Sequence, residues 1–114
     1  MVIKIIKDKI SLKELQTLAK EFYGSMTKGV ADIERGVVAF GGEYHMEANM
    51  SLIEDGSGQS NLWGFNVYLN KPREDWLEYT SLINIRPAAG NFDMMIGDEQ
   101  IRQKVKEIVN SKII

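Results

Sequence analysis

His45 is the single histidine of this 114-residue chain, and its side chain is therefore the one whose ordinary pKa lies near neutrality. If the chain around it is an extended strand, Glu43 and Glu47 flank it on the same face, about 6.6 to 7 Å away in each direction. A carboxylate at that distance can orient an imidazole or share a metal ion with it. His45 is thus a candidate catalytic base, and its carboxylate is one of three residues, Glu43, Glu47 or Asp32. The alternative is a strand whose polar face is merely hydrated.

Asn84 and Arg86 form a second polar pair, two positions apart on a segment that ends at Pro87. Arginine binds a carboxylate or a phosphate through two parallel N–H bonds, and an amide beside it can fix the orientation of the ligand. We expect the ligand-binding residues to be Arg86, Asn84, His45 and Asn66, and the permanent charge of Arg86 favours a small anionic ligand. The alternative is that Arg86 pairs with an acidic side chain across the sheet while Asn84 satisfies loop backbone groups.

Several classes of chemistry are excluded or disfavoured by composition. The chain has no cysteine, which excludes disulfides, thiolate zinc sites, iron–sulfur clusters and a cysteine nucleophile. No common motif for nucleotide, phosphate or zinc-protease chemistry occurs. With 16 acidic and 14 basic residues, the formal net charge of -2 disfavours a nucleic-acid partner, because phosphate contacts need a local excess of lysine and arginine. We expect no cofactor and no nucleic-acid partner, and we assign no metal ligands.

The spacing of apolar residues predicts the elements that must position these side chains. Period-two alternation predicts strands at residues 2–6, 30–34, 37–40, 45–53, 63–69 and 76–86. The alternation is cleanest at 45–53, where Met46, Met50 and Leu52 fall on one face and His45 on the other. A two-residue turn at Arg35-Gly36 would pair Ile33 with Val38, although a glycine bulge is equally allowed there.

Two helices complete the predicted fold. Ser11 with Glu14 forms a capping box at the start of a helix over 11–22, and Asp98 caps a helix over 98–112. We therefore predict an α+β fold: a largely antiparallel sheet of about five strands, with the N-terminal and C-terminal helices packed on one face. The length is that of one modest domain, covering 1–114.

This layering leaves the other face of the sheet free of helices. If no bulge at Gly41-Gly42 inverts the register, the polar candidates share that open face. They are Asp32, Glu34, Glu43, His45, Glu47, Asn66, Tyr68, Asn84 and Arg86. We accordingly expect Arg86, Asn84 and His45 to converge on one pocket beside the 87–91 loop.

Three segments carry a resemblance to a known family: residues 41–45, residues 62–68, and residues 83–87 with Gly90-Asn91. They resemble a small prokaryotic family of uncharacterised single-domain proteins, a domain of unknown function, over nearly the whole chain. The resemblance implies a bacterial or archaeal cytosolic protein. It implies no activity and no site residue.

Two functions are compatible with these residues. The first is a non-enzymatic binding or interaction module, a homodimer that uses the open face or an edge strand for a protein partner or a small anionic ligand. The alternative is a small hydrolase or metal-dependent enzyme based on His45; a toxin-like ribonuclease is disfavoured by the acidic balance. A perturbed His45 pKa would favour the enzyme, and a solvated imidazole the module. The charged N-terminus predicts no membrane segment, which makes the cytoplasm the expected compartment.

Overall fold

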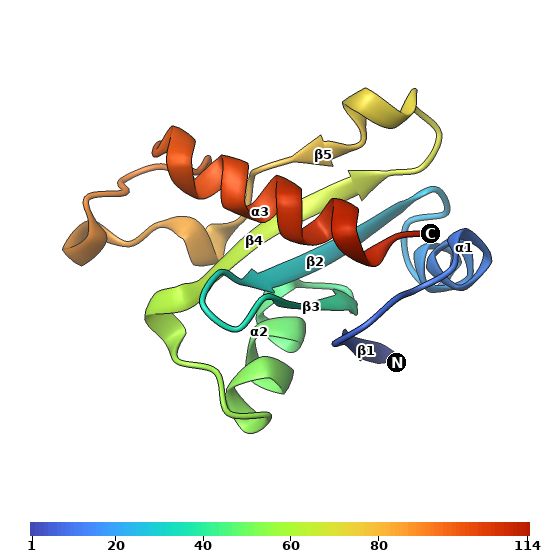
Figure 1. Ribbon diagram of the computed structural model, residues 1–114, viewed down its shortest axis with the longest axis horizontal. Helices are drawn as coiled ribbons and strands as arrows, with labels where there is room; N and C mark the ends of the chain where they lie inside the picture. The colour runs from blue at the N-terminus through green and yellow to red at the C-terminus, as the bar shows by residue number, and fades with distance from the viewer.

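The computed structural model describes the whole chain, residues 1–114, around a five-stranded antiparallel sheet (Figure 1). The strands lie in the order β1-β3-β2-β4-β5, and three helices pack on them. The strands are β1 (Ile3–Ile6), β2 (Met26–Asp32), β3 (Val37–Gly41), β4 (Leu62–Tyr68) and β5 (Leu77–Glu78); the helices are α1 (Leu12–Lys20), α2 (His45–Glu54) and α3 (Glu99–Lys112). The predicted α+β class and antiparallel sheet are confirmed.

The β2–β3 hairpin confirms the predicted faces but not the predicted pairing. Ala31 pairs with Val38, where the shorter turn would have paired Ile33 with Val38, because the loop spans residues 33–36. A shift of two positions leaves every side chain on its original face, since successive side chains of a strand alternate between faces. Ala31, Val38 and Phe40 therefore still point into one apolar cluster.

Helices α1 and α3 pack on the same face of the sheet, as predicted. Leu15 and Leu18 of α1 and Val105 and Val109 of α3 belong to one buried cluster with the β4 side chains Trp63, Phe65 and Val67. The predicted helix starts are also confirmed: Ser11 Oγ accepts a hydrogen bond from the Glu14 N–H at 3.1 Å, and the Asp98 carboxylate accepts from Gln100 and Ile101. In Figure 1, α3 runs along the near side of the sheet.

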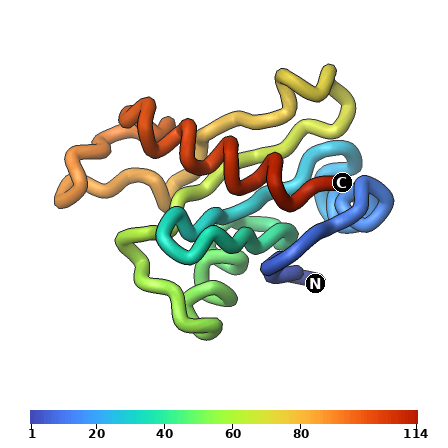
Figure 2. The backbone as a smooth tube through the Cα atoms, viewed as in Figure 1, coloured from blue at the N-terminus to red at the C-terminus, as the bar shows by residue number.

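The prediction of a strand over 45–53 is wrong, because these residues form helix α2 on the far side of the sheet from α3 (Figures 1 and 2). The buried positions 45, 48, 49 and 52 follow helical spacing, but His45 and Asn49 are polar, so hydrophobicity alone hides the stripe. Gly41 and Gly42 adopt positive φ angles of 113° and 93°, which L side chains rarely adopt, and they lead the chain from β3 into α2.

The predicted helix-free face is consequently covered. A second apolar cluster joins α2 to this face of the sheet, and it consists of Val30, Val37, Ala39, Ala48, Leu52 and Leu62. The sheet is therefore the middle of three layers. Of the polar candidates, Asp32, His45, Asn66 and Asn84 are buried, and the others are partly or fully exposed.

The predicted strand over 76–86 is also largely wrong, because β5 contains two residues. After it the chain forms single turns of 3-10 helix at Leu82–Asn84 and Pro87–Ala89. The segment before Asn84 packs over β4 at Gly64, where an added Cβ would lie 2.6 Å from the Ser81 Cβ. Glycine at 64 thus lets this segment close over the same face as α2.

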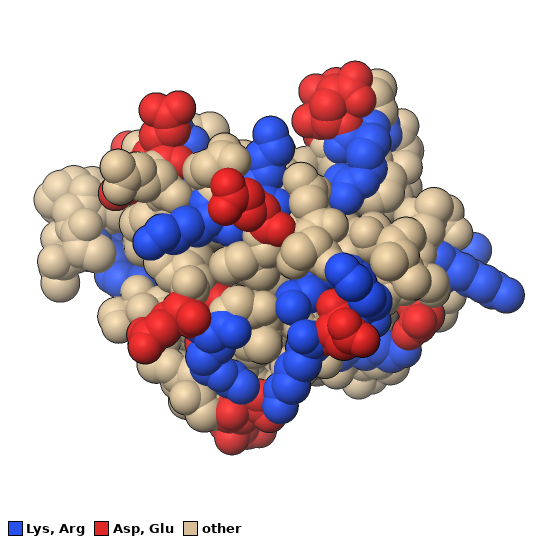
Figure 3. Space-filling view, in the orientation of Figure 1, with Lys and Arg blue, Asp and Glu red and all other residues tan.

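The charged side chains are mixed in sign on the face drawn in Figure 3. Lysine and arginine alternate there with aspartate and glutamate, and no large single-sign region covers α3. None of the helices combines the length and apolar character that a membrane span requires.

Candidate functional site

A cavity of about 450 Å³ lies between the N-terminal end of α2 and the segment at residues 80–83. Its lining is mainly apolar, with a few polar groups from β2, α2 and the loop after β5. The lining residues are Lys28, Tyr44, His45, Met46, Thr80, Ser81, Leu82, Ile83 and Met94. This is the usual character of a small-molecule site, in which apolar walls surround a small number of fixed polar groups.

His45 is the first residue of α2 and is 7% exposed. Its Nε2 lies 2.8 Å from the Phe65 carbonyl oxygen, so Nε2 carries the proton and donates it to that oxygen. Burial lowers the pKa of His45 to about 4, the charge of Lys28 acts in the same direction, and the Phe65 carbonyl and Asn66 partly oppose them. The imidazole is therefore neutral near pH 7, and Nδ1 is a hydrogen-bond acceptor without a partner in the chain.

Lys28 lines the same cavity from β2, and it was not among the site residues predicted from the sequence. Its ammonium lies 5.1 Å from the centre of the Tyr23 ring and forms no ion pair. Burial lowers the pKa of Lys28, and the negative charge of Glu78 partly opposes this. One signal was available: Lys28 is two positions from Val30, so both side chains face α2.

Asn66 lies on β4 opposite Lys28, and one of the two polar atoms of its side-chain amide has no hydrogen-bond partner. Its Nδ2 donates to Glu78 Oε1 at 2.8 Å, and the Tyr68 hydroxyl donates to the same oxygen at 2.8 Å. The Asn66 Oδ1 atom is buried and has no partner. His45 and Asn66 thus each hold an unused acceptor on this face of the sheet.

Asn84 satisfies backbone groups, which confirms the structural alternative stated for it. The residue is fully buried, and its Oδ1 accepts from the Gly64 N–H at 2.8 Å. Its Nδ2 donates to the carbonyl oxygens of Gly64 and Met94, at 3.0 and 3.1 Å. The carboxamide therefore replaces the strand partner that Gly64 lacks beyond the end of β5, and both of its amide hydrogens are used.

Arg86 acts in the same way on neighbouring backbone. Its Nη2 donates to the carbonyls of Leu62 and Ile83, at 2.6 and 3.1 Å, and Nη1 donates to Ser60 at 3.3 Å. The guanidinium also lies over the Trp63 ring, 4.3 Å from its centre, and burial lowers the pKa of Arg86. The expected pairing with an acidic side chain does not occur.

The three residues expected to converge on one pocket are therefore separated. His45 lines the cavity, whereas Arg86, Asn84 and Asn66 do not. Their shared face was inferred from two strands that the structure replaces by α2 and by 3-10 turns. Arg86 and Asn84 instead hold the segment at residues 81–84, which forms one side of the cavity.

Glu47 and Asp32, two of the three carboxylates expected beside His45, have other partners. Glu47 Oε1 accepts from the backbone N–H groups of Glu43 and Tyr44, both at 2.8 Å, which caps α2. The main-chain carbonyl of Glu43, not its carboxylate, accepts a hydrogen bond from the Tyr23 hydroxyl. Positions 45 and 47 share a face in a strand but not in a helix, so α2 separates these side chains. No group of three or more histidine, aspartate or glutamate side chains is arranged to hold a metal ion.

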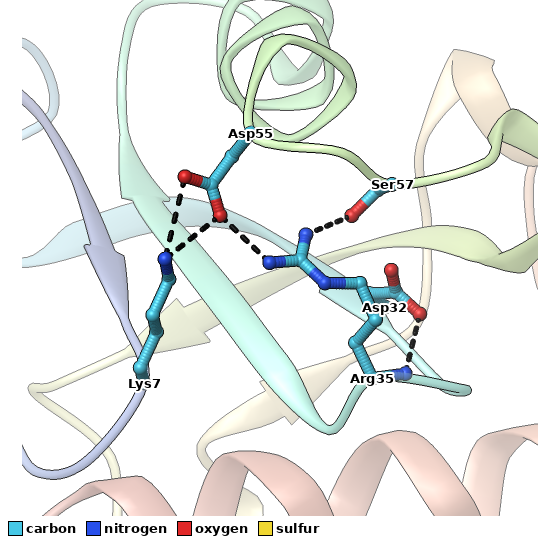
Figure 4. Close-up of polar contacts among 5 residues, drawn as sticks. All are labelled: Lys7, Asp32, Arg35, Asp55 and Ser57. Carbon is cyan, nitrogen blue, oxygen red and sulfur yellow. Dashed lines mark hydrogen bonds and ion pairs between the residues drawn. The ribbon is translucent and has the colours of Figure 1, made fainter.

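Asp32 belongs to a separate polar cluster at the β2–β3 hairpin. The cluster consists of Lys7, Asp32, Arg35, Asp55 and Ser57 (Figure 4). Asp32 Oδ1 accepts from two N–H groups of the hairpin loop, those of Glu34 and Arg35, both at 2.9 Å, while its Oδ2 is buried without a partner. Arg35 bonds Asp55 at 2.7 Å and Ser57 at 2.7 Å, which ties the end of α2 to the hairpin. Asp32 is thus a turn-forming residue outside the cavity.

Comparison with known proteins adds a family but no activity. Residues 4–112 match the family described as "Protein of unknown function (DUF5674)". No curated protein and no solved structure matches the chain.

Proposed function

The chain belongs to the DUF5674 family of proteins of unknown function, and from its cavity we propose that it is a non-enzymatic binding protein for a small molecule. The proposed ligand has an apolar body and a polar head that carries a hydrogen-bond donor. The observation that carries this proposal is the unpartnered Nδ1 acceptor of His45 at an apolar cavity of about 450 Å³.

The size of the cavity sets the size of the ligand. At roughly 30 Å³ for one water in the liquid, 450 Å³ corresponds to about 15 waters, so a ligand of about a dozen non-hydrogen atoms fits. Met46, Leu82, Ile83 and Met94 would contact its apolar part. Two of these are methionines, whose flexible thioethers adapt to ligands of differing shape.

The chemistry of His45 favours binding over catalysis. Its perturbed pKa would by itself match the enzyme alternative, but the cause is burial, and a base with a pKa of about 4 accepts protons poorly near pH 7. No carboxylate contacts its second nitrogen to orient or charge it. A neutral imidazole with a fixed Nε2–H is instead suited to accept a hydrogen bond at Nδ1.

The other predicted site residues support the proposed site from outside. Arg86 and Asn84 hold the 81–84 segment through backbone carbonyl and N–H groups, so they would position one side of the cavity. Asn66 would act on the His45 imidazole, whose pKa it raises. We propose these three as positioning residues, with His45 as the direct ligand contact.

A matched pair of methionines tests this proposal. Met46 and Met50 lie one turn apart on α2 and are 49% and 47% exposed, but Met46 lines the cavity and Met50 does not. The probe is 3-phenylpropane-1,2-diol at millimolar concentration, with binding followed by the NMR shifts of the methionine methyl groups and the His45 imidazole. Binding to the wild type and to Met50→Trp, with loss in Met46→Trp, is the expected result.

Two results would overturn the proposal. One is the absence of saturable shifts from this diol and from its carboxylate counterpart, 2-hydroxy-3-phenylpropanoate. The other is equal binding by Met46→Trp and Met50→Trp, which would place the probe elsewhere on the surface. Unchanged far-UV circular dichroism of both variants ensures that the comparison concerns the cavity and not folding.

A further inference from the structure

We propose that the ligand of this cavity is an anion, a small apolar carboxylic acid with a hydroxyl group beside the carboxylate, and that Lys28 is its charge partner. This inference rests on the proposed binding function and adds the charge of the ligand. Lys28 and His45 line the same cavity from β2 and α2, and one offers a cation while the other offers an acceptor.

Lys28 is a cation without a counter-ion. The ion pairs of this chain join Lys4 to Glu14, and Lys7 and Arg35 to Asp55, so Lys28 has no carboxylate within 4.0 Å. Its ammonium donates no hydrogen bond to the protein and has the Tyr23 ring as its close neighbour. A half-buried ammonium without a counter-ion has lost part of its hydration, and no protein group replaces the lost water contacts. A bound anion would replace them.

Glu78 does not fill this role, although its charge acts on Lys28. Glu78 Oε1 accepts from the Asn66 amide and from the Tyr68 hydroxyl, both at 2.8 Å. These bonds engage one oxygen of the carboxylate, and Glu78 forms no ion pair with Lys28, although its charge acts on both Lys28 and His45. An anion in the cavity therefore meets an ammonium that no internal acid has neutralised.

Arg86, another half-buried cation, is a weaker candidate for the anion. Its guanidinium already donates to the carbonyls of Ser60, Leu62 and Ile83 and lies over Trp63. Most of its directed hydrogen bonds are thus used within the protein, and it does not line the cavity. The charge available to a ligand is that of Lys28.

The N-terminal end of α2 reinforces the preference for an anion. The N-cap residue Tyr44 and the first helical residues His45 and Met46 line the cavity, so the N-terminal end of the helix dipole, where Glu47 caps the Glu43 and Tyr44 N–H groups, lies beside the ligand. The Nδ1 lone pair of His45 repels a bare carboxylate but accepts from a hydroxyl. A carboxylate directed at Lys28 with a neighbouring hydroxyl directed at His45 satisfies both groups.

Two probes that differ in the group beside the hydroxyl, a charged carboxylate in one and a neutral CH2OH group in the other, test the inference. They are 2-hydroxy-3-phenylpropanoate and 3-phenylpropane-1,2-diol, which share the phenyl body and the hydroxyl group. By calorimetry at pH 7 we expect the carboxylate to bind about fivefold more tightly than the diol, because hydrogen bonds to a charged group are worth about 1 kcal/mol more than neutral ones. Added salt should narrow this difference.

Lysine variants identify the charge partner. Lys28→Met should bind the two probes equally, and Lys28→Arg should keep the preference for the carboxylate. Lys71→Met is the matched control, because the Lys71 ammonium also lies over a tyrosine ring, 4.4 Å from the centre of Tyr68, but outside the cavity. The control should behave as the wild type.

The outcomes separate this inference from the proposed function. If the diol binds the wild type as tightly as the carboxylate, the inference is wrong while the binding function stands. A carboxylate preference that persists in Lys28→Met would also overturn it, provided that this variant still binds the diol and is therefore folded. If neither probe binds the wild type, the binding function itself fails.

Discussion

Neutral His45 makes the stability of this protein depend on pH in a defined direction. Burial lowers the pKa of His45 to about 4 in the folded state, against an ordinary value of 6.5 in an unfolded chain. Between these values the unfolded chain binds a proton that the folded protein does not, so acidification favours unfolding. The contribution of His45 is fully present above pH 6.5 and is lost as the pH falls toward 4.

The size of the effect follows from the shift. A drop of about 2.5 pKa units corresponds to about 3 kcal/mol of unfolding free energy over the whole window, at about 1.36 kcal/mol per unit. Between pH 7 and pH 5 the unfolded chain becomes largely protonated at this residue while the folded protein does not, and we expect a loss of about 2 kcal/mol. That is a large fraction of the total stability of an ordinary domain.

The assay combines a titration with a variant that cannot titrate. The NMR shifts of the His45 imidazole give its pKa in the folded protein, and urea unfolding at pH 7, 6 and 5 gives the free energy of unfolding. His45→Gln keeps an N–H donor for the Phe65 carbonyl without an ionisable ring. The difference between wild type and variant cancels the titration of the carboxylates, and it should change by about 2 kcal/mol across this range.

Two results would refute the reasoning. An imidazole that titrates near 6.5 in the folded protein is solvated, and a solvated ring would not face the cavity as a desolvated neutral acceptor. Parallel stability profiles of wild type and His45→Gln would show that His45 has the same pKa in the folded and unfolded states.

Four further predictions concern packing, the loop and self-association. Val105→Ala should lower the free energy of unfolding in urea by about 1 to 3 kcal/mol, since Val105 is fully buried. Asn84→Ala removes three hydrogen bonds to backbone groups, and a loss of about 2 to 4 kcal/mol is expected; an unchanged urea midpoint would mean that the Gly64 pairing is not needed. Ser11→Ala should cost about 0.5 to 2 kcal/mol and Ser11→Gly less, by thermal unfolding. The homodimer contact near exposed Met50 stays a prediction: sedimentation at micromolar concentration should show a dimer that Met50→Lys dissociates, and a wild-type monomer would end it.

The elements that depend on neighbours in sequence could be predicted from the sequence alone. Ser11 and Asp98 cap their helices because the bonded N–H groups lie two or three residues away. The faces of the β2–β3 hairpin follow from alternation, which survives a pairing shift of two residues. These interactions are local, so the residues that determine them are adjacent in the printed chain.

Helix α2 could be assigned only from the tertiary structure, because its sequence fits both the period of a strand and the period of a helix. Met46, Met50 and Leu52 suit one face of a strand, but the structure buries positions 45, 48, 49 and 52 against the sheet. What decides between them is the apolar surface of Val30, Ala39 and Leu62, which a strand at the sheet edge would leave uncovered. That surface is assembled from three strands and is not visible in any one segment.

The candidate site divides in the same way. His45 could be singled out from its type, and it does line the cavity, but its burial, neutrality and partner were set by α2. For Lys28 the sequence offered only its alternation with Val30, because a lysine in a strand becomes notable only when the fold encloses it without a counter-ion. Asn84 and Arg86 were predicted to bind a ligand, yet in the structure they bond backbone groups, some of which lie about twenty residues away along the chain. A sequence determines which side chains can do chemistry, and long-range packing determines which of their polar atoms remain free to do it.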